Sequence, residues 1–162
     1  MQSHTWLLLQ LVQLIVKFTS SHQTSMRSRL PLNPAQIVNL ALKPYIALDW
    51  IERCGLCEES ALVVLQYLFI AEACCAIGHM TYGKTLVSEA QRRLAESFEV
   101  ATETGEGRLD DETYLAVKDG LSVYTAQLHV IAAADVPAAA AMIKAWRESY
   151  NTRTAGKQLT AA

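Results

Sequence analysis

The clearest pattern of apolar and polar positions in this chain lies between residues 114 and 131. Its apolar members are separated by alternating gaps of three and four residues; they are Tyr114, Val117, Leu121, Tyr124, Leu128 and Ile131. An α-helix places residues with this spacing on one narrow stripe, as in a coiled coil or a helical bundle. The pattern therefore predicts a helix over 110–133 that packs against another apolar helix face.

Capping signals and apolar stretches predict four more helices, over 34–53, 58–77, 85–103 and 137–150. The first has a strong start, because Asn33 can act as N-cap, Pro34 can occupy N1, and Gln36 can reach back from N3. Pro44 falls inside this helix, so we expect a kink or a break near 42–44. Asp110 is the expected N-cap of the striped helix.

The second predicted helix is apolar nearly all round between 61 and 77, where only Gln66 and Glu72 interrupt it. Such a helix is either the centre of a bundle or a membrane span. The stretch is at the short end of spanning length, and a carboxylate near its middle is costly in lipid. We therefore expect a central helix and no membrane span. Glu72 should be paired, with His79, Lys43 or Lys118, or reach an edge.

No segment has a convincing strand pattern, and the connections between predicted helices are short. The sequence thus predicts an all-α, single-domain bundle of about five helices around a central apolar helix, with antiparallel neighbours. We assign the helical domain to 30–150, an extension that need not belong to the fold to 1–29, and a disordered tail to 151–162. The apolar run at 6–16 is either dispensable or a short helix that binds a membrane surface or a partner.

Charge and cysteine content narrow the classes of function. The formal net charge is −2 and no basic stripe is present, so the footprint of a nucleic-acid-binding protein is missing. A chain with a full apolar core does not need disulfides, and nothing else indicates secretion. We therefore expect a cytoplasmic protein with reduced thiols at Cys54, Cys57, Cys74 and Cys75.

The segment from Gly78 to Thr85 matches the phosphate-binding pattern G-x-x-x-x-G-K-[ST] in full. In a true P-loop, backbone N–H groups cradle the phosphates, the lysine (here Lys84) reaches the β- and γ-phosphates, and the hydroxyl holds Mg²⁺. That loop follows a buried strand of a parallel sheet, whereas a long helical pattern precedes Gly78. The simpler interpretation is a corner between two helices that needs two glycines.

Cys54 and Cys57 form a C-x-x-C motif, and Cys75 and His79 follow at a spacing that suits a zinc site. If the first two helices fold back on each other, however, the motif lies a helix length, roughly 25 Å, from Cys75. This separation argues against a single four-ligand site. A redox dithiol is the other chemical interpretation, since Cys57 lies near a helix N-terminus. Buried cysteines that act as small apolar residues are the commonest case.

Two stretches carry a family resemblance: Leu40-Ala41-Leu42 with Ile46-Ala47-Leu48, and Tyr124-Thr125-Ala126-Gln127-Leu128 before the alanine-rich last helix. They resemble small uncharacterised helical proteins carried by proteobacterial phages, prophages and plasmids. The resemblance covers about 30–150, and it implies a cytoplasmic accessory protein without indicating functional residues.

The sequence therefore favours a non-enzymatic interaction protein without a cofactor, which buries an apolar helical face against a protein partner or a second copy of itself. Aromatic residues and methionine are typical interface anchors. On that basis the predicted interaction surface consists of Tyr124, Leu128, Met142, Trp146 and Tyr150. The alternatives are a zinc or thiol-redox protein that uses Cys54 and Cys57, and, less favoured, a nucleotide-binding protein that uses the segment 78–85.

Overall fold

Local capping signals fix where the first helix begins. The Asn33 side chain accepts a hydrogen bond from the Gln36 backbone N–H at 2.9 Å, and the Gln36 side chain accepts one from the Asn33 N–H at 3.0 Å. This reciprocal capping box starts helix α2 (Pro34–Cys54), as predicted. Asp110 likewise caps helix α5 (Asp111–Leu128) by accepting from the Thr113 N–H.

The computed structural model describes residues 30–105, 107–132, 134–135, 138–139, 141–143 and 145. Besides α2 and α5, these residues form helix α3 (Glu58–Ala76), the 3₁₀ turn η2 (Thr81–Gly83) and helix α4 (Lys84–Thr104). Several described positions between 135 and 145 are also helical. The described residues contain no strand, only an isolated bridge between Pro31 and Ala132. The predicted all-α single-domain bundle is thus confirmed.

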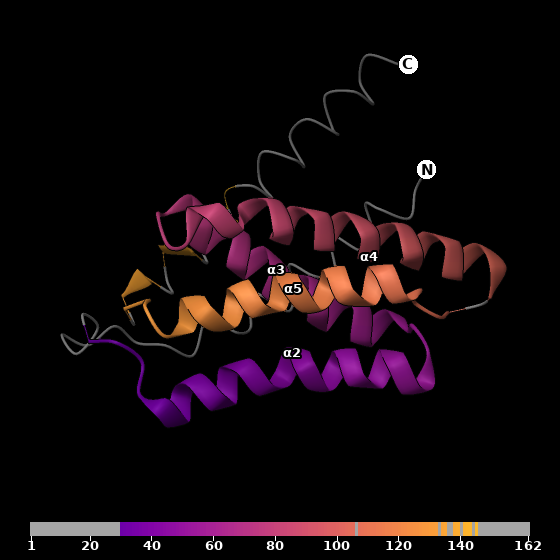
Figure 1. The fold of residues 1–162 in the computed structure, drawn as a ribbon, viewed down its shortest axis with the longest axis horizontal. Coiled ribbons are helices and arrows are strands. Elements are labelled where there is room, and N and C mark those ends of the chain that lie inside the picture. The colour runs from indigo at the N-terminus through magenta and orange to yellow at the C-terminus, as the bar shows by residue number, and fades with distance from the viewer. Residues whose placement is uncertain are drawn as a thin grey trace, which may run out of the picture.

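Successive helices run in opposite directions, as the short connections predict (Figure 1). In that view α2 forms the lower edge of the bundle and α4 the upper edge, with α3 and α5 between them. α3 contacts α2, α4 and α5. It is the one described helix long and apolar enough to cross a membrane, but 67% of its most apolar window is buried in the bundle. α3 is therefore the central core helix that the sequence predicts.

A glycine allows α4 and α5 to approach each other closely. A Cβ atom added at Gly120 in α5 would lie 2.8 Å from the Ala90 Cβ of α4 and 2.8 Å from Leu68 Cδ2 of α3. These distances are too short for carbon atoms that are not bonded, so no larger residue fits without moving a helix. The three helices consequently share one apolar core.

Two predicted details of the helices differ from the structure. α2 continues through Pro44 without a break, and Pro44 is fully buried. Pro44 cannot donate a backbone hydrogen bond within the helix, and the free energy gained by burying its side chain in the core offsets this loss. α5 ends at Leu128 rather than near residue 133, because the chain turns at His129 and Val130 and places Ile131 in the core.

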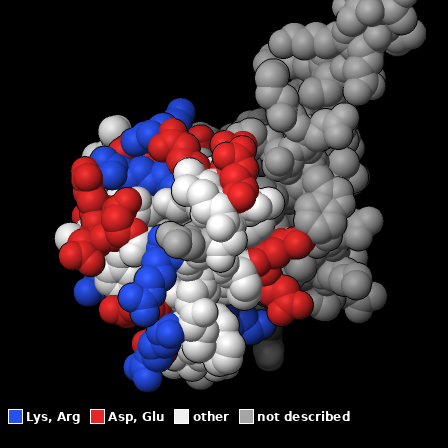
Figure 2. Space-filling model, turned by 90° about the vertical axis from the view of Figure 1, so that its right-hand side faces the viewer, with Lys and Arg blue, Asp and Glu red and all other residues white. Residues whose placement is uncertain are grey.

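The outer face of α4 carries a network of ion pairs. The i,i+4 pairs Glu89–Arg93 and Arg92–Glu96 are both present at 2.6 Å, and Arg93 also reaches Glu112 of α5 at 2.7 Å. Hydrogen bonds from Arg92 and Arg93 lower the pKa of Glu89 to about 2. At the end of the bundle shown in Figure 2, acidic and basic side chains are interspersed.

A candidate interaction surface on helix α2

Four large apolar side chains lie exposed along the outer side of α2. They recur at every fourth residue, and 52–60% of each is exposed: Val38, Leu42, Ile46 and Trp50. In a helix this spacing aligns side chains into a continuous ridge. We call these four residues the α2 ridge.

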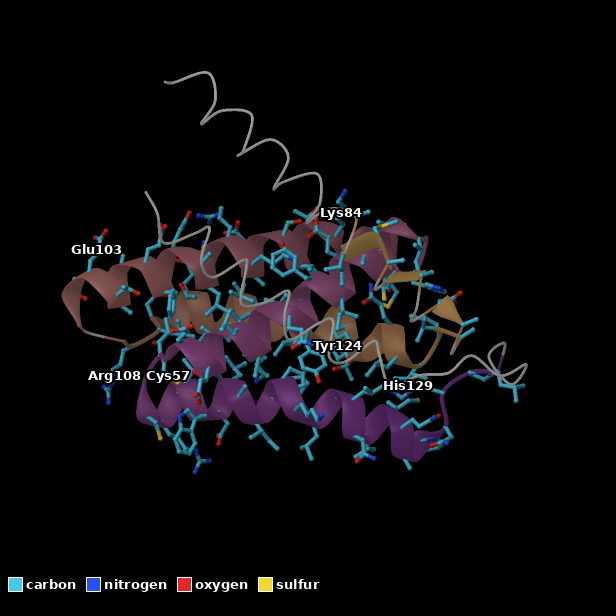
Figure 3. The ribbon with its side chains drawn as sticks, turned by 180° about the vertical axis from the view of Figure 1, so that it is seen from behind. Cys57, Lys84, Glu103, Arg108, Tyr124 and His129 are labelled. Carbon is cyan, nitrogen blue, oxygen red and sulfur yellow. The ribbon has the colours of Figure 1, made fainter. Side chains whose placement is uncertain are left out.

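The opposite side of α2 already fills the core. Pro44, Ala47, Leu48 and Ile51 are buried there. Figure 1 and Figure 3 show α3, α4 and α5 all on one side of α2, with no described helix on the other side. The helix is therefore apolar on two faces, and the described part of the chain covers only one of them.

Charged side chains of both signs flank the α2 ridge. Lys43 is exposed, and Asp49 lies 2.9 Å from Arg53 in an i,i+4 pair. The surroundings of the ridge are thus polar, and the charges nearly cancel. An apolar strip with a polar rim is the arrangement found at protein–protein interfaces.

The interaction surface predicted on α5 is in part wrong. Tyr124 is 2% exposed and Leu128 is 4% exposed, so neither can meet a partner on the surface. Tyr124 packs on Tyr67 of α3, with ring centroids 5.2 Å apart. Burial raises the pKa of Tyr124, and Tyr67 adds to this shift. The stripe predicted from the sequence is the core-facing side of α5.

The remaining residues of that predicted surface come from the last helix. Met142 is partly buried against the core. Trp146 and Tyr150 lie outside the described residues. The predicted surface therefore reduces, in the described residues, to one half-buried methionine.

Cys54 and Cys57 lie at the corner between α2 and α3, at the same end of the bundle as Arg108 (Figure 3). Cys54 ends α2, Cys57 is the N-cap of α3, and both are exposed free thiols. The Cys57 sulfur lies 3.1 Å from the Ser60 hydroxyl. The residues between the cysteines are outside both helices, so the motif does not sit on the first turn of one helix as in thioredoxin.

Cys75 and His79 lie at the other end of α3, as the argument from helix length predicts. Cys75 is buried, and its sulfur contacts the Met80 carbonyl oxygen and the Gln127 side chain. His79 Nε2 lies 2.9 Å from an Asp135 carboxylate oxygen. Among the described residues, no three His, Cys, Asp or Glu side chains are grouped so that they could hold a metal ion. The four candidate ligands are not brought together.

Gln127 is a buried polar residue that the sequence analysis did not single out. Its side-chain Nε2 donates to the carbonyl oxygens of Ala71 at 3.0 Å and His79 at 3.1 Å, which ties the end of α3 to α5. Its Oε1 atom is buried without a hydrogen-bond partner. Gln127 lies three residues after Tyr124 and one before Leu128, so its position fits the buried stripe, but its polar side chain gave no sign of burial.

The P-loop-like segment forms a helix corner. α3 precedes it, Met80 adopts a left-handed conformation with φ of 54°, and η2 leads directly into α4. The backbone N–H groups of Gly78 and His79 donate to carbonyl oxygens at the end of α3, and those of Gly83 and Lys84 donate to carbonyl oxygens within the corner. Those groups are therefore not available to cradle phosphate, and Gly83 packs against Val123.

Glu72 has a partner that was not among those predicted. Its carboxylate accepts a hydrogen bond from the Gln91 side chain of α4 at 3.1 Å. The residue is half-buried. This contact fits a structural hydrogen bond between α3 and α4.

Comparisons of the chain with protein-family models, curated proteins and solved structures found no match.

Proposed function

We propose that this protein is a non-enzymatic interaction protein that binds a helical surface of a protein partner through the α2 ridge. The observation that carries the proposal is the row of four large apolar side chains, each more than half exposed, along one outer helix. The proposal keeps the accessory role in the cytoplasm that the sequence resemblance implies, and moves the contact surface from α5 to α2.

Energetics support a role in binding for the α2 ridge. Fully burying a Val, Leu or Ile side chain contributes about 1.5–3 kcal/mol, so covering a half-exposed one gains roughly half of this. Trp50 adds the residue type most enriched among residues that dominate binding energy. A face of this shape suits the recognition mode in which residues at i and i+4 of a helix anchor an interface.

Photo-cross-linking of the full chain in cells tests this proposal. A photoreactive amino acid replaces Leu42 on the α2 ridge in one variant, and Leu115 in a matched control. Leu115 is an equally apolar residue on α5 and is 56% exposed, against 52% for Leu42. We expect a discrete protein adduct from position 42 and none from position 115. Equal labelling at the two positions, or no adduct at position 42, would contradict the proposal.

A further inference from the structure

We propose that the occupant of the α2 ridge is the same ridge of a second copy of this chain. The two α2 helices run in the same N-to-C direction and cross near Ile46. This inference rests on the proposed function, because it names the partner of that surface. Three observations carry it: the spacing of the α2 ridge, the placement of the charges that flank it, and the lack of charged residues in the competing occupant.

The spacing of the α2 ridge makes it complementary to itself. Its members follow an i, i+4 row. Rows of this kind on two helices interdigitate at a crossing angle of about −50°, the commonest class of helix packing in globular proteins. A second α2 therefore offers a surface of the required shape, centred on Ile46 with Leu42 and Trp50 one turn to either side.

The flanking charges select the direction of the crossing. Lys43 lies three residues before Ile46 and Asp49 three residues after it, which places them on opposite flanks, about 60° from the ridge. When two identical ridges meet face to face in the same direction, the Lys43 flank of one copy meets the Asp49 flank of the other. If the two helices ran in opposite directions, the two Lys43 flanks would meet each other, and so would the two Asp49 flanks. Like charges then repel, so the same-direction crossing is favoured.

The same charges favour a second copy over the chain's own N-terminal segment. The apolar stretch from Trp6 to Val16 is the other candidate occupant within this protein, and it contains no charged residue. It could cover apolar surface but would offer nothing to Lys43 or Asp49. A second copy supplies a carboxylate for Lys43 together with the apolar row, while Asp49 is already paired with Arg53 of its own helix.

Sedimentation equilibrium of the full chain gives the first test. It is run in a reducing buffer, because the exposed Cys54 and Cys57 could otherwise form disulfide-linked dimers. We expect a reversible dimer whose dissociation constant rises at least about tenfold in Ile46→Glu, since a charge is then buried at the crossing point. Leu115→Glu is the matched control, because the two side chains are 57% and 56% exposed. Equal effects of the two substitutions would overturn the inference.

Charge exchange tests the direction of the crossing. In the same-direction dimer, Lys43→Glu alone and Asp49→Lys alone each place like charges together and weaken the dimer. An equimolar mixture of the two variants restores opposite charges at both positions, so it should dimerise about as well as the unmodified chain. If neither single substitution weakens the dimer, the proposed crossing is wrong. Circular dichroism checks that each variant retains its helix content.

The outcomes separate this inference from the proposed function. If the chain stays monomeric at several hundred micromolar while position 42 cross-links to a different protein, the second copy is excluded and the proposed function stands. If position 42 cross-links within its own chain to the 6–16 segment, the face is covered internally and both proposals fail.

Discussion

Val123 of α5 leaves room only for glycine at position 83. A Cβ atom added there would lie 2.5 Å from Val123 Cγ1, although the backbone, with φ of −78° and ψ of −9°, is one that alanine adopts readily. The requirement for glycine is therefore one of packing and not of backbone conformation. This explains the second glycine of the P-loop-like pattern without any phosphate.

Gly83→Ala should destabilise the protein by about 1–3 kcal/mol, the range typical of an overpacked core. Thermal or urea unfolding measures the effect. In the Val123→Ala background the same substitution should cost less, because the obstructing methyl groups are gone. A cost that is the same in both backgrounds would show that Val123 is not the cause.

We expect the four cysteines to differ in reactivity, because two are exposed and two are buried. Cys54 and Cys57 are exposed at the α2–α3 corner, whereas Cys74 and Cys75 are buried near the end of α3. Burial raises the pKa of Cys74 to about 12, and it also raises the pKa of Cys75. The thiolate is the reactive form, so burial and the raised pKa should both slow the reaction of Cys74 and Cys75 with a labelling reagent.

Thiol labelling of the folded protein at pH 8 should therefore show two fast and two slow cysteines, and denaturant should make all four fast. Mass spectrometry of the labelled peptides assigns each rate to a residue. A disulfide between Cys54 and Cys57 in protein purified without reductant would instead support the thiol-redox alternative.

At the scale of elements, the local signals were sufficient to predict most of the fold. Asn33 and Asp110 act within three residues of themselves, so their caps could be predicted from sequence alone. The end of α5 could not, because the chain turns at His129 and Val130 and Ile131 then packs into a core formed by residues far away in the chain. Local sequence does not contain those contacts.

The candidate surface shows the same limit. The i, i+4 spacing of Val38, Leu42, Ile46 and Trp50 is visible in the sequence, but so is the second apolar face that contains Leu48 and Ile51. Which face is buried depends on where α3 and α5 lie. Conversely, the regular stripe containing Tyr124 and Leu128 marks the side of α5 that the core covers most completely. The regular spacing of apolar residues therefore does not by itself distinguish a buried face from an exposed one.

At the scale of the whole molecule, the ionisable groups of the core predict the response of stability to alkaline pH. The pKa values of Cys74, Tyr67 and Tyr124 are all raised, chiefly by burial. The folded state therefore keeps protons that the unfolded chain releases. The contribution of Cys74 to the free energy of unfolding is fully present below the pKa of the unfolded thiol, near 9. It is lost as the pH rises toward the raised pKa of Cys74, about 12.

Each such group should lower the free energy of unfolding by up to about 1.4 kcal/mol per pH unit between its unfolded and its folded pKa. Urea unfolding between pH 7 and pH 11 measures the slope. Cys74→Ala should flatten the slope between pH 9 and pH 10, where the thiols titrate before the tyrosines do. Cys57→Ala, which removes an exposed thiol instead of a buried one, is the matched control. A slope that Cys74→Ala does not alter would refute this assignment.

The contact between Leu56 and Gly107 has a consequence for engineering the protein. The Leu56 backbone N–H donates to the Gly107 carbonyl oxygen, and a Cβ atom at Gly107 would lie 2.7 Å from the Leu56 carbonyl oxygen. The α2–α3 and α4–α5 connections are therefore fastened to each other, main chain to main chain. A peptide tag or reporter domain inserted into either connection would disturb both, so neither is a suitable insertion point.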